Sequence, residues 1–161
     1  MLQRLEKKDA LRAVLRGAHE EAQALGSSTV EAEHLLLALA ADEHDPTGRL
    51  LVESGLDHEE VRGALELETE RSLGAVGVAL SEFTLPETTG APRRRPKLAA
   101  SARRVIERAA RIMAARRDRR ITSSHLLLGI LGADIGTVPR ALAAADVDRE
   151  ALAVRAERLL A

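Results

Sequence analysis

This chain of 161 residues contains the same tetrapeptide twice, as His34-Leu35-Leu36-Leu37 and as His125-Leu126-Leu127-Leu128. The two stretches are 91 positions apart. The same offset, without gaps, aligns further identical pairs: Arg12 with Arg103, Val14 with Val105, Ala18 with Ala109, Arg49 with Arg140, Leu51 with Leu142, Asp57 with Asp148 and Glu59 with Glu150. A register that stays constant over so long a stretch indicates an internal duplication.

The first copy is predicted to form four helices. Its opening stretch has the apolar spacing of one buried helical stripe: Leu11, Val14, Leu15, Ala18, Ala22 and Leu25. Gly26 predicts the end of this helix. The hydroxyls of Ser27, Ser28 and Thr29 are expected to cap the next helix, which is apolar over most of its girth and therefore central. A short third helix holds Leu50 and Leu51.

A fourth helix of the first copy is expected to begin at Asp57, because an aspartate at that position can accept a backbone N–H of the first turn. The second copy repeats this plan. Its first stripe contains Val105 and Ala109. Thr122 and Ser123 are expected to cap its central helix, and Asp148 its last helix.

The duplication divides the chain into residues 1–71 as the first repeat, 72–97 as a linker and 98–161 as the second repeat. The linker holds three of the five prolines and three of the eleven glycines, which disfavours a continuous helix. Phe83, the one aromatic residue, is expected to be a packing anchor there. We predict an all-α fold in which two tandem four-helix repeats pack as a pseudo-twofold eight-helix bundle.

Composition excludes several functions. The chain has no Cys, which removes disulfides, thiolate metal sites and cysteine nucleophiles. The charged N-terminus has no apolar signal segment, and no apolar run approaches the ~20 residues of a membrane span, so we expect a cytoplasmic protein. Residues 1–80 hold 16 acidic and 8 basic residues, and the remainder is basic.

The motifs resemble the N-terminal domain of the Clp family of AAA+ unfoldases, and most closely the ClpC or ClpA type. That family carries a Gly-Thr-Glu-His-Leu-Leu-Leu-Gly stretch in both repeats. Here the stretches run from Glu31 to Ala38 and from Thr122 to Gly129, and residues 13–26 are similar to the family's first helix.

The resemblance implies a non-enzymatic module that receives protein or peptide ligands, namely Clp substrates, adaptors and cyclic-peptide antibiotics. No cofactor or metal is expected. The sequence has no Gly-x-x-x-x-Gly-Lys-Ser/Thr motif, so it lacks a phosphate cradle of that type. We therefore expect a stand-alone Clp repeat protein, which would act as a decoy or regulator of the unfoldase.

The resemblance also nominates binding residues. Some family members recognise phosphoarginine, with the Glu of each Glu-His motif on the guanidinium and an early Thr on the phosphate. Here Glu33 keeps the first acid, while Ser124 replaces the second. Lys8 and Ala99 stand where the threonines would be.

Actinobacterial relatives bind cyclic-peptide antibiotics between the repeats through phenylalanines, and those positions read Lys7 and Leu98 here. A basic residue is kept at Arg103. The predicted protein- or peptide-binding residues are therefore Lys7, Lys8, Glu33, Leu98, Arg103 and Ser124.

Two other functions stay open. The arginine-rich second half suits a regulator that binds nucleic acid, although no aromatic stacking residues or helix-turn-helix signature accompany it. A structural subunit that oligomerises through its groove is the third alternative. Metal binding and catalysis are not expected, because the five histidines lack ligand spacing. His34 and His125 are instead expected to be hydrogen-bonded structural residues.

Overall fold

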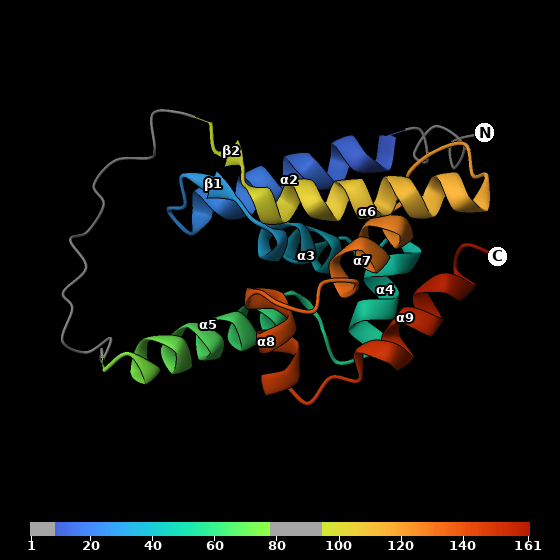
Figure 1. The fold of residues 1–161 in the computed structure, drawn as a ribbon. Helices are drawn as coiled ribbons and strands as arrows, with labels where there is room; N and C mark the ends of the chain where they lie inside the picture. Colours follow the sequence, from blue (N-terminus) through green and yellow to red (C-terminus); the bar gives the residue numbers. More distant parts are fainter. Residues whose placement is uncertain (1–8, 78–94) are drawn as a thin grey trace.

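The computed structural model describes residues 9–77 and 95–161, and these residues form eight helices and two very short strands (Figure 1). The first copy contains α2 (Ala10–Ala24), α3 (Ala32–Ala41), α4 (Pro46–Glu53) and α5 (His58–Ala75). The second contains α6 (Ala100–Arg116), α7 (Ser123–Leu131), α8 (Thr137–Ala144) and α9 (Arg149–Arg158). The predicted all-α class is confirmed.

The helices obey the offset found in the sequence. Moved by 91 positions, α4 coincides with α8, and the first residue of α5 coincides with that of α9. The packing repeats in the same way: α2 packs on α3 as α6 packs on α7, and α5 packs on α8 as α9 packs on α4. Since each copy uses the other's third helix to cover its fourth, the two repeats form one pseudo-twofold bundle.

The apolar helices α3 and α7 lie at the centre and contact each other. In Figure 1 they are sandwiched between α2 and α6 on one side and the remaining four helices on the other. Leu35, Leu126 and Leu127 have no exposed surface. Burial of large aliphatic side chains stabilises folding by about 1.5–3 kcal/mol each, so the α3–α7 seam contributes to cohesion between the copies, together with the contact of α5 with α8.

The histidine that opens each central helix is buried and structural, as predicted. The Nδ1 atom of His34 accepts the backbone N–H of Glu31 at 2.8 Å, and Nδ1 of His125 accepts that of Thr122 at 3.0 Å. The Nε2–H of His125 donates to Asp118 at 3.0 Å. Burial, partly offset by the charges of Glu31 and Glu21, lowers the pKa of His34 and keeps Nδ1 free to accept.

The predicted cap of α3 was wrong. Its N-cap residue is Glu31, whereas Thr29 belongs to the strand β1 (Thr29–Val30). This strand pairs in parallel with β2 (Lys97–Leu98). The pairing extends the backbone through Thr29 and Val30, so the helix can begin only after it. The predicted caps Asp57, Thr122 and Asp148 are all found at the expected helix starts.

The predicted linker begins at Ser72, but α5 continues to Ala75. The Ser72 hydroxyl donates to the carboxylate of Glu68 one turn earlier, which supports the added helical turn. Phe83 and the central part of the linker lie outside the described residues.

Glycine permits close contact between the first and second helices of each copy. A Cβ atom placed on Gly129 of α7 would lie 2.5 Å from the carbonyl oxygen of Val105 on α6. In the first copy the corresponding residue is Ala38, and the close approach there is permitted by Gly17, where an added Cβ would lie 3.1 Å from that of Ala38. The first copy therefore has its glycine on the first helix of the pair, α2, whereas the second copy has it on the central helix, α7.

We predict that Gly129→Ala destabilises the fold by about 1–3 kcal/mol, because the added methyl group forces α6 away from α7. The measurement is urea unfolding followed by circular dichroism at 222 nm, since the chain has no Trp or Tyr to report by fluorescence. Gly63→Ala on α5 is the matched control. It has open space around it and should stabilise by about 0.5–1 kcal/mol. Equal effects of the two variants would contradict the packing described.

Candidate functional site

The structure separates the predicted binding residues into two places. Leu98 and Arg103 come together beside the short strand pair, where Nε and Nη2 of Arg103 donate to the carbonyl oxygen of Leu98 at 3.2 and 3.0 Å. Glu33 and Ser124 occupy equivalent positions in the first turns of α3 and α7. Lys7 and Lys8 lie outside the described residues.

Glu33 is a half-buried carboxylate in the first turn of α3, close to the charges of Glu31 and Glu68. Desolvation by burial raises its pKa, its own backbone N–H opposes that rise, and the nearby charges of Glu31 and Glu68 add to it. Over residues 9–77 and 95–161, no Lys or Arg forms an ion pair with this carboxylate. A desolvated acid without a protein cation can gain strongly from a cation supplied by a ligand.

The neighbouring acids are already satisfied. The carboxylate of Glu31 accepts the hydroxyl of Thr29 at 3.2 Å and also that of Ser101 on α6. Glu68 is buried and accepts Nε of Arg140 at 2.7 Å. The hydroxyl of Ser72, more than the charge of Arg140, lowers the pKa of Glu68 against the effect of burial. Glu33 is thus the acid of this group that remains available.

The sequence did not reveal the Glu68–Arg140 pair, which joins α5 of one copy to α8 of the other. One signal was present. Glu68 follows Val61, Ala64 and Leu65 at helical spacing, so it had to lie on the buried face of α5. Arg140 matched Arg49 across the duplication, but nothing in the sequence indicated that it faces α5.

Ser124 lies inside the seam between the copies rather than on a surface. It is buried, and its hydroxyl is hydrogen-bonded to that of Thr47 on α4 at 2.9 Å. The adjacent Ser123 donates to Asp45 at 3.2 Å. The position equivalent to Glu33 is therefore closed in the second copy, and only the first copy presents an acid to a ligand.

Several arginines of the basic half hold the bundle together. Arg108 donates to the carbonyl oxygen of Gly129 at 2.8 Å, and Arg116 to that of Leu160 at 2.8 Å. These guanidinium groups act as cross-links between helices. Nucleic-acid binding by the remaining arginines, including Arg117, Arg119 and Arg120, stays a prediction.

Within the two described ranges, no three His, Asp or Glu side chains gather as a metal site. No helix in that part of the chain has the length and apolar character to span a membrane. The cytoplasmic location stays a prediction.

The geometry defines a class of protein: a duplicated, histidine-capped helical domain with an asymmetric acidic surface. Two solved structures share the fold. The N-terminal domain of the caseinolytic protease associated chaperone ClpD from Arabidopsis thaliana superposes with a TM-score of 0.69 at 24% identity, covering 96% of each chain. The Hsp104 N-terminal domain from Candida albicans superposes with a TM-score of 0.64 at 18% identity, covering 94% of this chain and 89% of that one.

Residues 8–145 match the profile of the Clp repeat (R) N-terminal domain, and the chain belongs to that family. The family prediction is therefore confirmed. Among curated proteins, none matches this sequence. Clp N-terminal domains are non-catalytic modules that bind the substrates and adaptors of Clp unfoldases.

We predict that Glu33→Gln raises the melting temperature at pH 7. The raised pKa of Glu33 means that folding disfavours its ionised form, so the wild type loses stability as the pH rises above the unfolded value of 4.5. The gain in the variant should disappear at pH 4, where the carboxyl is protonated in both states. Glu70→Gln, on the exposed side of α5, is the control. It should change the free energy of unfolding by no more than about 0.5 kcal/mol and so leave the melting temperature nearly unchanged. A destabilised Glu33→Gln protein would contradict this account.

Proposed function

We propose that this protein is a non-catalytic module that binds polypeptide segments carrying a basic side chain. The observation that carries the proposal is the half-buried carboxylate of Glu33, which forms no ion pair with a described residue, on a fold of the Clp repeat family. Family membership supports a polypeptide ligand, and the electrostatics of this surface support a cationic contact.

Arginine is the favoured cation. A guanidinium group presents a planar fork of donors that matches both oxygens of a carboxylate, whereas an ammonium acts as a point charge. Lys8, Lys7, Leu98 and Arg103 remain proposed contributors to ligand binding. Ser124 supports a single acid at this pair of equivalent positions, because its hydroxyl is already bonded to that of Thr47.

We propose further that the protein competes with the N-terminal domains of a Clp unfoldase for the same ligands. A Clp repeat domain that binds the same ligands would withhold substrates or adaptors from the motor. This regulatory role rests on the first proposal, since a competitor must first bind the ligand.

The test is fluorescence anisotropy with labelled 12-residue peptides in a Gly/Ser background that contain Arg, Glu or neither. Arg peptides should bind. Glu33→Gln should lower the affinity for them by about three- to tenfold, which is the cost of losing one partly desolvated charge pair. Glu70→Gln is the matched control and should bind as the wild type does.

Equal binding of Arg and Glu peptides would contradict the proposal, and so would an unchanged affinity in Glu33→Gln. The competition proposal requires in addition that a purified Clp unfoldase N-terminal domain displace the Arg peptide from this protein. Failure of displacement would refute competition alone.

A further inference from the structure

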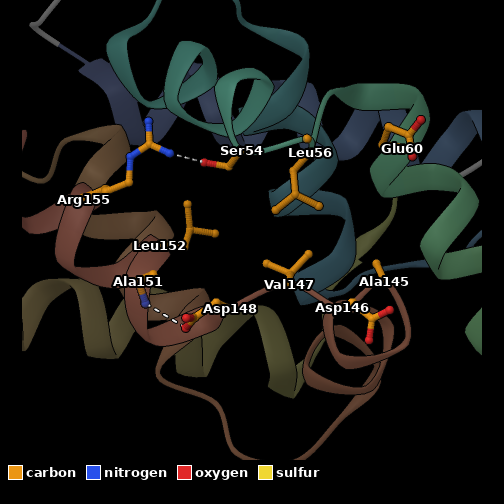
Figure 2. Close-up of a pocket in the computed structure, with 11 residues that line it drawn as sticks. Ser54, Leu56, Glu60, Ala145, Asp146, Val147, Asp148, Ala151, Leu152 and Arg155 are labelled. Atoms are coloured by element: carbon orange, nitrogen blue, oxygen red, sulfur yellow. Dashed lines mark hydrogen bonds between the residues drawn. The ribbon is translucent and has the colours of Figure 1, made fainter.

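The turns after α4 and α8 lie on the side of the bundle away from α2 and α6 (Figure 1). A cavity lies where these two turns face each other, near the pseudo-twofold axis (Figure 2). Its volume is about 410 Å³, within the range of sites that hold small ligands or single side chains. The lining residues pair at the offset of the duplication: Ser54 with Ala145, Gly55 with Asp146, Leu56 with Val147, and Glu60 with Ala151. The cavity is thus a product of the way the two copies meet.

The floor of the cavity is apolar. Figure 2 shows the side chains of Leu56, Val147 and Leu152 turned toward its centre from both copies. Leu56 and Leu152 are almost fully buried, and Val147 is half-buried. An apolar group that entered from solvent would therefore bury surface of Val147, which Leu56 and Leu152 support from beneath.

The rim is acidic. Glu60 and Asp146 are exposed at its edge, and neither forms an ion pair with another described residue. Asp148 uses one carboxylate oxygen to cap α9 by accepting the N–H of Ala151 at 3.0 Å. Glycine occupies the place of Asp146 in the first copy, so the second copy has added a carboxylate to an otherwise similar turn.

Among the described residues that line the cavity, Arg155 is the one cation, and it already pairs with an acid. Arg155 donates to the hydroxyl of Ser54 at 2.9 Å and to the carboxylate of Glu53 at 3.0 Å. Its guanidinium therefore holds α9 on α4 and leaves the rim negative. A phosphate or carboxylate would meet net repulsion here, whereas an ammonium or guanidinium would be attracted.

From the floor and the rim together, we propose that this cavity binds a partner polypeptide through an apolar side chain adjacent to Lys or Arg. The apolar side chain would rest on Val147, and the cation would meet Glu60 and Asp146. This deepens the proposed function and rests on it, because it adds a second contact region for the same class of ligand.

The test uses amide chemical-shift mapping of the full-length protein with octapeptides in a Gly/Ser background. A peptide containing Leu-Arg should shift signals of residues 54–60 and 145–152. Peptides containing Ala-Arg or Leu-Glu should bind several-fold more weakly. The double variant Asp146→Gly/Glu60→Gln should weaken the Leu-Arg peptide about three- to tenfold. It restores at 146 the glycine found in the other copy, which protects the fold.

Glu33→Gln separates this proposal from the proposed function. It should leave the shifts of residues 54–60 and 145–152 unchanged, while it weakens Arg peptides that bind at Glu33. Absence of shifts at the cavity, or equal binding of the Leu-Arg and Leu-Glu peptides, overturns the cavity proposal. Neither result bears on binding at Glu33, which the anisotropy experiment tests separately.

Discussion

The burial of two apolar helices against each other is the interaction on which the rest of this structure depends. α3 and α7 are too apolar to face water on any side, so each must be covered by its own copy and by the other. A single copy would leave one face of its central helix exposed. The buried histidine at the start of each helix accepts a backbone N–H that would otherwise lack a hydrogen-bond partner. Duplication and capping are thus two parts of one solution.

The proposed binding surfaces lie where the two copies differ in sequence. One copy keeps Glu33 as a half-buried acid at the surface, while the other places Ser124 against Thr47 and closes the same position. Near the pseudo-twofold axis, Asp146 of the second copy occupies the position of Gly55 in the first. Each of these differences leaves a carboxylate in one copy where the other copy has none. A pseudo-symmetric scaffold therefore presents an asymmetric acidic surface.

The fold could be predicted from the sequence because its determinants are local and repeated. Helical spacing, the offset of 91 positions and the Asp caps all act within a few residues of one another. The failures involve contacts between distant residues. The start of α3 depends on Val30 pairing with Leu98, and the Glu68–Arg140 pair depends on how α5 crosses α8. Ser124 was expected at a surface, because its position in the motif gives no sign that Thr47 approaches it.

The central claim is that the α3–α7 seam makes the two copies one cooperative unit. Calorimetric unfolding of the wild type, Leu36→Ala and Leu127→Ala tests it most directly. These leucines lie in equivalent positions of α3 and α7, and each truncation should cost about 2–5 kcal/mol. The account predicts a single unfolding transition with equal calorimetric and van't Hoff enthalpies. Either substitution should shift this whole transition to lower temperature. Two transitions, each shifted by the substitution in its own copy and untouched by the other, would contradict it.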